Sequence, residues 1–90
     1  MDFESISIIF KALSDVNRLK IVSLLSEGEK CACVLLDNFQ FKQSTLSYHM
    51  KFLVESKIIY ARSEGKWMYY SLNKDNLNVI IDTLKSFNKE

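Results

Sequence analysis

The stretch CACVLLDNFQFKQSTLSYHMKFL, residues 31–53, carries the two signals that decide the fold. The first is a pair of thiols, Cys31 and Cys33, which follows a break containing Gly28. The second is the polar run 43–48, whose outward face lacks large apolar side chains. Together these signals predict two helices joined by a turn, with soft metal ligands on the first helix.

The segment from about Gln43 to Ser56 has the period of an amphipathic helix. Leu46, Met50 and Leu53 recur at i, i+4 and i+7, which places them on one buried face. At about 100° per residue, the opposite face carries mainly hydrogen-bonding and basic groups, namely Ser44, Ser47, Tyr48, Lys51 and Glu55. Such groups suit the major groove of DNA, so this helix is the predicted recognition helix.

After this helix the pattern changes to that of strands. Residues 58–62 and 67–72 are rich in aromatic and β-branched side chains, and they flank the glycine-containing turn 63–66. A β-hairpin directly after a recognition helix is the order of a winged helix-turn-helix. We interpret the aromatic residues of the second strand as packing rather than base-stacking groups, namely Trp67, Tyr69 and Tyr70.

Apolar spacing predicts four further helices, at about 3–13, 15–26, 31–39 and 75–88. Ser14 is expected to cap the second helix, and Leu19 and Val34 are expected to be buried. The predicted fold is therefore mainly α with a small β-hairpin, in the order α-α-α-α-β-β-α. It forms a single winged helix-turn-helix domain over residues 1–90.

The first and last predicted helices carry more apolar surface than one small core needs. We therefore expect them to pair in a homodimer, which would place two recognition helices about 34 Å apart, one turn of DNA. A pure protein-interaction module, in which these helices bind another chain, is the alternative.

Charge is distributed unevenly along the chain. Residues 42–74 carry six basic and two acidic side chains, a net +4, whereas residues 1–41 carry −2 and residues 75–90 carry −1. A positive middle region suits phosphate contact, although an ordinary solvated face would look the same.

No run approaches the length of a membrane span and the N-terminus does not resemble a signal peptide, so we expect a cytoplasmic protein with reduced thiols.

Three segments resemble the ArsR/SmtB family of dimeric winged-helix repressors, and above all its arsenic-responsive members. They are ALSDVNRLKIVSLLSEGEKCACVLL, KQSTLSYHMKFLVESKII and RSEGKWMYYSL, within a match that covers residues 6 to about 73. The resemblance implies a homodimer that binds operator DNA and represses an efflux or detoxification operon. Arsenite or antimonite would release it as inducer, with no obligatory cofactor.

The resemblance also assigns roles to individual residues. Cys31 and Cys33 match the inducer site, and Arg62 to Lys66 match the wing. The recognition-helix motif is matched by Gln43, Ser44, Thr45, Ser47, Tyr48 and His49. Phosphate contacts are expected from Lys42, Lys51, Arg62 and Lys66, while His49 is either a buried, hydrogen-bonded side chain or a DNA contact.

The chain departs from the family pattern at several places, three of which bear on the sites. Leu36 stands where some arsenic sensors have a third cysteine. Lys42 stands where a serine commonly caps the recognition helix, and its ammonium could contact a phosphate instead. Residues 75–90 contain no histidine, so the zinc site of other members is absent from this segment.

The thiol pair is suited to a thiophilic ion such as As(III). The third arsenic ligand would be solvent, a small thiol or another group. If both cysteines lay on a regular helix, their side chains would point about 200° apart. We therefore predict that metalloid binding distorts the first turn of that helix and shifts the recognition helix. The helix N-terminus and Lys30 are expected to lower both thiol pKa values.

Other roles for the thiols stay open. They could sense oxidants, persulfides or another thiophilic metal ion, or simply pack as small hydrophobic residues. A thiol oxidoreductase is disfavoured because it usually has Cys-x-x-Cys beside a βαβ unit. No catalytic constellation is visible in the sequence, so we do not expect an enzyme.

Overall fold

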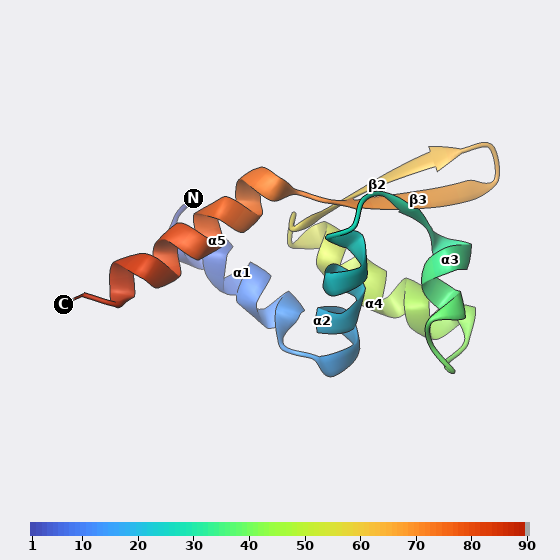
Figure 1. Cartoon of the computed structure of the whole chain (residues 1–90), viewed down its shortest axis with the longest axis horizontal. Helices are drawn as coiled ribbons and strands as arrows, with labels where there is room; N and C mark the ends of the chain where they lie inside the picture. Colours follow the sequence, from blue (N-terminus) through green and yellow to red (C-terminus); the bar gives the residue numbers. More distant parts are fainter. Residues whose placement is uncertain (90) are drawn as a thin grey trace.

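The computed structural model describes residues 1–89 and has the predicted winged helix-turn-helix architecture. Five helices and a small antiparallel sheet follow one another along the chain (Figure 1). In chain order they are α1 (Phe3–Leu13), α2 (Val16–Leu25), β1 (Lys30–Cys31), α3 (Ala32–Asp37), α4 (Gln43–Glu55), β2 (Ile59–Glu64), β3 (Trp67–Leu72) and α5 (Lys74–Phe87).

The core lies where α1, α2 and α4 pack on one another beneath the sheet. The inner face of α4 is the predicted one, because Leu46, Met50 and Leu53 are all buried. They pack with aliphatic side chains of the other elements, among them Ile9, Ile21, Leu25, Leu35, Ile58 and Ile59. This core holds α4 with its polar side outward.

The sheet has three strands in the order β1-β3-β2, one more than predicted. The two residues of β1 pair with β3, so that Cys31 lies opposite Tyr69. Strand β2 runs further than predicted, to Glu64, and the hairpin closes through Gly65 and Lys66 alone. Gly65 has φ +60°, a value that glycine adopts without steric cost.

The prediction of one helix over residues 31–39 was wrong. Cys31 lies in a strand, and the helix covers Ala32–Asp37 only. The start of α2 also differs, since its N-cap is Asp15 rather than Ser14. The Asp15 carboxylate accepts hydrogen bonds from the backbone N–H groups of Asn17 and Arg18, at 2.8 and 3.1 Å. Both donors bind the same oxygen, Oδ1.

Two residues that were expected to be buried face solvent. Leu19 is 54% exposed and Val34 is 45% exposed. Apolar residues occur on all sides of α2, so their spacing along the helix did not distinguish its inner face from its outer face. Helix α3 is shorter than two turns, and a helix of this length gives no clear periodicity.

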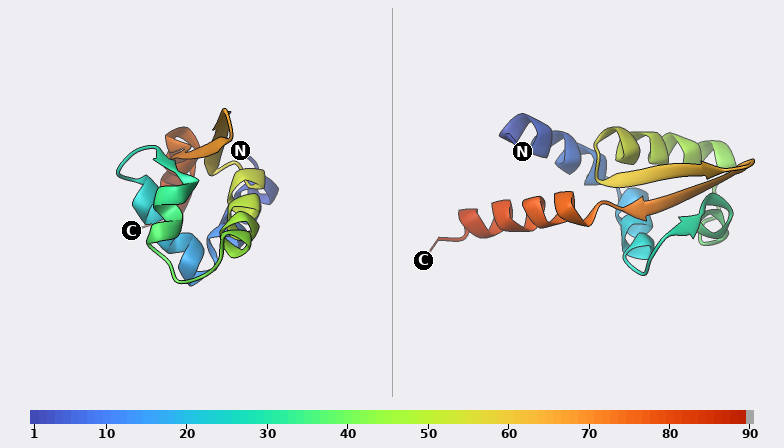
Figure 2. Two further views of the ribbon diagram at one scale, coloured as in Figure 1. Left: turned by 90° about the vertical axis from the view of Figure 1, so that its right-hand side faces the viewer. Right: turned by 90° about the horizontal axis from the view of Figure 1, so that it is seen from above.

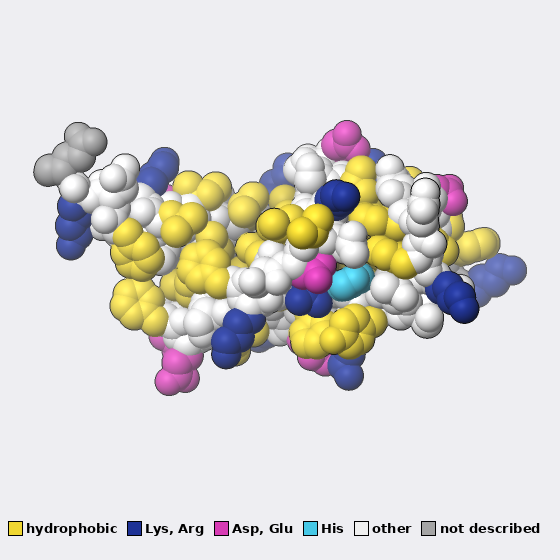
Figure 3. Space-filling model, turned by 90° about the horizontal axis from the view of Figure 1, so that it is seen from below, with side chains coloured by type: hydrophobic (Ala, Val, Ile, Leu, Met, Phe, Trp, Pro, Cys, Tyr) yellow, Lys and Arg dark blue, Asp and Glu magenta, His cyan; other side chains and the backbone are white. Residues whose placement is uncertain are grey.

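Helix α5 extends away from the helix-turn-helix, and both termini lie at that end of the long axis (Figure 2). Ile80 is its one buried residue within Lys74–Phe87. Hydrophobic side chains gather over this end of the molecule, where α1 and α5 lie (Figure 3). We name this surface the terminal apolar face, and its exposed members are Phe3, Ile8, Ile81, Leu84 and Phe87.

Candidate thiol site and nucleic-acid interface

The outward face of α4 presents polar side chains to solvent. Gln43, Ser44, Ser47, Tyr48 and Lys51 are all exposed, and Thr45 is half-buried. Lys42 is the N-cap and its side chain makes no capping hydrogen bond, as expected from the missing serine. The first N–H groups of α4 therefore lack a side-chain partner from the N-cap residue, which leaves them open to an anion.

His49 is buried beneath this face, with 7% of its surface exposed. Its Nδ1 atom lies 3.4 Å from Nη1 of Arg18, and its ring packs against Phe41 and Tyr48. The guanidinium can only donate, so Nδ1 accepts and the ring proton is assigned to Nε2. Of the two roles predicted for His49, the structure agrees with the buried, hydrogen-bonded one.

Arg62, a predicted phosphate contact, is already held by two carboxylates. Its Nε and Nη2 atoms donate to the two Glu29 carboxylate oxygens at 2.8 and 2.7 Å, and Nη1 donates to Glu64 at 2.9 Å. Its guanidinium also stacks on the ring of Tyr69, 4.6 Å from the centroid. These contacts raise the Arg62 pKa further and lower the pKa of Glu29.

These contacts give Arg62 a structural role that the sequence did not predict, and its phosphate contact stays a prediction. Its positive charge is compensated, and it joins the loop before β1 to the wing. At the wing tip, the ammonium of Lys66 is exposed and lies 5.5 Å from the centroid of the Trp67 ring. Among residues 1–89, no carboxylate pairs with Lys66. Lys66 is thus the basic side chain of the hairpin that is available for phosphate.

The two thiols lie side by side at the start of α3. Cys31 ends β1 and is the N-cap of α3, and its Sγ accepts a hydrogen bond from the Cys33 N–H at 3.3 Å. A hydrogen bond between the two side chains lowers the pKa of the Cys31 thiol and raises that of Cys33. Cys31 is buried, whereas Cys33 is exposed.

The thiol pair differs from the prediction in one respect, because Cys31 precedes α3 instead of lying on it. The distortion of α3 on metalloid binding stays a prediction, whereas the prediction that both thiol pKa values are lowered was wrong. The pKa values shift in opposite directions, and Lys30 is not among the causes, since its ammonium pairs with Glu27 at 3.2 Å. One thiol of the pair is therefore more readily ionised and the other is more accessible.

The donor set fits a thiophilic ion only in part. Within residues 1–89, no group of three or more histidine, cysteine or acidic side chains is placed to hold a metal. Cys31 and Cys33 can supply two sulfur ligands to an arsenic(III) centre, which forms three bonds. Leu36, three residues after Cys33, has no donor atom.

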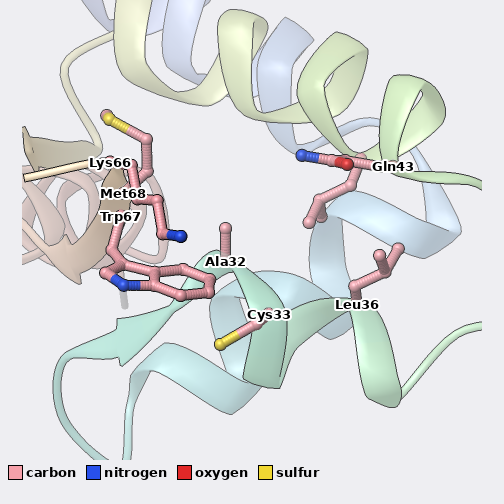
Figure 4. A pocket seen from close by; sticks show the side chains of 8 residues that line it. Ala32, Cys33, Leu36, Gln43, Lys66, Trp67 and Met68 are labelled. Carbon is pink, nitrogen blue, oxygen red and sulfur yellow. The ribbon is translucent and has the colours of Figure 1, made fainter.

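A cavity of about 230 Å³ lies beside Cys33, between α3, α4 and the hairpin. Figure 4 shows Cys33 and Leu36 on α3, Gln43 on α4, and Lys66, Trp67 and Met68 on the hairpin around this space. Its complete lining is Ala32, Cys33, Leu36, Gln43, Leu46, Lys66, Trp67 and Met68. Sequence reasoning missed this cavity because three separate segments form it.

Comparison with known proteins places the chain in a family. The model of the family described as bacterial regulatory protein, arsR family, matches residues 15–61. This chain belongs to the ArsR family. Members are DNA-binding transcriptional regulators, in agreement with the prediction that the protein is not an enzyme. No helix of residues 1–89 is long and apolar enough to cross a membrane.

The sequence is similar to several arsenical resistance operon repressors. The protein of Staphylococcus aureus is 48% identical over 88 residues, which cover 98% of this chain and 85% of that protein. The protein of Bacillus subtilis is 41% identical over 73 residues, covering 80% and 70%. A crystal structure of a possible transcriptional regulator for arsenical resistance superposes with a TM-score of 0.79 at 26% identity, covering 89% and 83%.

Proposed function

We propose that this protein is a homodimeric cytoplasmic repressor of an arsenic-resistance operon. As(III) or Sb(III), bound by Cys31 and Cys33, releases it from operator DNA. The observation that carries the proposal is the placement of the two thiols: Cys31 ends the strand that pairs with the wing, and its Sγ accepts a hydrogen bond from the N–H of Cys33 in the first turn of α3. The similarity to arsenical resistance operon repressors supports arsenic as the inducer element.

In this proposal α4 enters the major groove with its exposed face. Gln43, Ser44, Ser47 and Tyr48 contact base edges, because they occupy the first turns of the helix. Lys42, Thr45 and Lys51 contact phosphates or the groove wall beside them, and Lys66 contacts phosphate from the wing tip. His49 supports this surface from below through Tyr48 and Arg18.

The terminal apolar face supports the homodimer. It combines both terminal helices and would be covered when two copies pair about a two-fold axis. Leu84→Arg should convert the protein to a monomer and weaken operator binding, because it places a charge in that interface. Ser86→Arg adds the same charge on the opposite side of α5 and is the matched control. A Leu84→Arg protein that stays dimeric in light scattering would place the interface elsewhere.

The signal from the thiols reaches the DNA-binding elements through the sheet. Cys31 pairs with Tyr69 on β3, and Arg62 on β2 connects the wing to Glu29 just before β1. A ligand that bridges both sulfurs fixes the end of β1 relative to the start of α3. Any shift of β1 is transmitted to β3, and the orientation of the wing changes with it.

The test is fluorescence anisotropy of the reduced protein on labelled DNA from its own upstream region. Arsenite should release the wild-type protein, whereas the Cys31→Ser/Cys33→Ser double variant should stay bound, because serine keeps the shape but provides no thiolate. Both proteins should bind equally well before arsenite is added. If arsenite releases both proteins equally, the thiols are not the inducer site.

Oxidation of the same thiols is a second candidate, and their mutual contact and the exposure of Cys33 favour it. Peroxide would take two electrons from the pair, giving one disulfide and two water molecules with the two thiol protons. Peroxide should then release DNA without arsenite, and dithiothreitol should restore binding. If peroxide has no effect under conditions where arsenite acts, this candidate is wrong.

A further inference from the structure

The cavity beside Cys33 and the two-thiol site together suggest a more specific ligand. We propose that the site takes a trivalent organoarsenical, with arsenic bonded to Cys31 and Cys33 and its carbon substituent in the cavity. The inference rests on the proposed function, because it names the ligand class of the same site.

The number of ligands supports this choice. Arsenic(III) makes three bonds, and in a monosubstituted organoarsenical one of these bonds goes to carbon. Two thiols then complete the centre, and two thiols are what this site provides. Residues 1–89 hold no third donor in a suitable group, and Leu36 lines the adjoining cavity with an apolar side chain.

The lining of the cavity suits a carbon substituent. Its walls include five apolar side chains, namely Ala32, Leu36, Leu46, Trp67 and Met68. A volume of about 230 Å³ exceeds the roughly 150 Å³ of an apolar cavity that binds benzene. The indole of Trp67 and the thioether of Met68 are groups that pack well against an aromatic ring. A phenyl substituent therefore fits in size and in chemistry.

The binding step balances without a redox partner. In water the ligand is R–As(OH)₂, with arsenic in the +3 state. Each thiolate sulfur forms one As–S bond and displaces one hydroxide, which leaves as water with the proton of that thiol. Two thiols consume both hydroxyl groups and release two water molecules, and the As–C bond remains intact.

The position of the cavity connects this ligand to DNA binding. Gln43 at the start of α4 and Lys66 at the wing tip both line it, and both are proposed DNA contacts. A substituent in the cavity would pack between these two elements and fix their separation. An organoarsenical should therefore release DNA at a lower concentration than inorganic arsenite does.

Trp67 is the only tryptophan in the chain, so its fluorescence reports on the cavity. The reduced full-length protein is titrated without DNA, with phenylarsenite in one series and inorganic arsenite in the other. Intact mass should show one phenylarsenic group per chain, with both thiols blocked to alkylation. Phenylarsenite should bind more tightly, since burying two carbon groups already contributes about tenfold in affinity.

Free dithiols can also prefer organoarsenicals, so the deciding quantity is the ratio of the two affinities in cavity variants. Ala32→Leu fills the cavity and should lower the phenyl preference about tenfold, with arsenite affinity unchanged. Met68→Ala removes one wall of the cavity at an exposed strand position and should lower the phenyl preference several-fold. Val34→Leu adds bulk on the exposed side of α3, outside the cavity, and is the matched control.

Two results would overturn the inference. One is an unchanged ratio in both cavity variants, and the other is an equal fall in Val34→Leu. Measuring the release of operator DNA by each ligand distinguishes this inference from the proposed function. If phenylarsenite binds in the cavity but does not release DNA, the ligand assignment stands and the inducer role fails. If arsenite releases DNA while the cavity variants keep the wild-type ratio, the proposed function stands and this inference fails.

Discussion

Helix α4 and the wing are both proposed DNA contacts, yet they differ in how their polar side chains are used. On α4, the outward side chains of Ser44, Ser47 and Lys51 have no ion-pair or hydrogen-bond partner within residues 1–89. On the wing, Arg62 has three charge-assisted hydrogen bonds to two carboxylates and a stacking contact with Tyr69.

The difference indicates that α4 and the hairpin have different roles. The face of α4 has free donors and acceptors, as a surface that reads a ligand needs. In the hairpin, the guanidinium of Arg62 binds Glu29 and so joins β2 to the loop that precedes the thiols. We infer that α4 provides most of the affinity, while the hairpin transmits the state of the thiol site.

The largest effect is expected for a carboxylate placed on α4. Ser44→Glu should weaken operator binding by about 100-fold or more, because a negative charge would face the phosphates and base edges. The stability of α4 should not fall, since a glutamate in the first turn interacts favourably with the helix dipole. Fluorescence anisotropy measures the affinity, and urea unfolding checks the stability.

Ser14→Glu is the matched control, because it adds the same charge at an exposed position just before α2. Its operator affinity should stay within a few-fold of wild type. If Ser44→Glu binds as tightly as Ser14→Glu, then α4 does not enter the groove and the first half of the comparison is wrong.

Sequence reasoning described α4 well because its signal is local. Three apolar residues at helical spacing determine which side is buried, and the polar side follows from them. The short strand β1 has no such signal, since two residues show no period and β1 forms only because Tyr69 and Tyr70 pair with it. The prediction placed Cys31 on a helix for this reason.

The contacts of Arg62 and the cavity were missed for a related reason. Glu29 and Arg62 are 33 residues apart, and nothing near either residue in the chain indicates that they meet. The cavity needs α3, α4 and the hairpin in place before it exists. Side-chain contacts between distant segments depend on the packed fold, which residue spacing does not describe.

A smaller effect should distinguish the two basic residues of the hairpin. Lys66→Ala should lower operator affinity and flatten the dependence on salt by about one unit of logarithmic slope per protomer. Arg62→Ala should leave the slope near the wild-type value, because the guanidinium already has carboxylate partners. Anisotropy titrations over a range of potassium chloride concentrations measure both slopes.

The opposite result is informative. If Arg62→Ala flattens the slope as much as Lys66→Ala does, Arg62 must leave Glu29 and Glu64 when the protein binds DNA. The wing would then read phosphate in the same way as α4, and the contrast between the two elements would disappear.

The smallest effect concerns the pH dependence of stability at the base of the wing. Arg62 lowers the pKa of Glu29 below its usual 4.5, so the ionised carboxylate favours the folded state. This contribution is fully present above about pH 4.5 and is lost as the pH falls through the lowered pKa. Glu29→Gln removes it, because the amide does not titrate.

Urea midpoints measured at about pH 7 and about pH 3 test this expectation. The wild-type midpoint should fall more on acidification than that of Glu29→Gln. Asp15, whose pKa is lowered by its capping hydrogen bonds, contributes equally to both proteins, so their difference isolates Glu29. Equal losses would mean that Glu29 and Arg62 do not hold each other in solution. The hairpin would then be free to move without the thiol loop, and the sheet could not carry the signal in the way proposed.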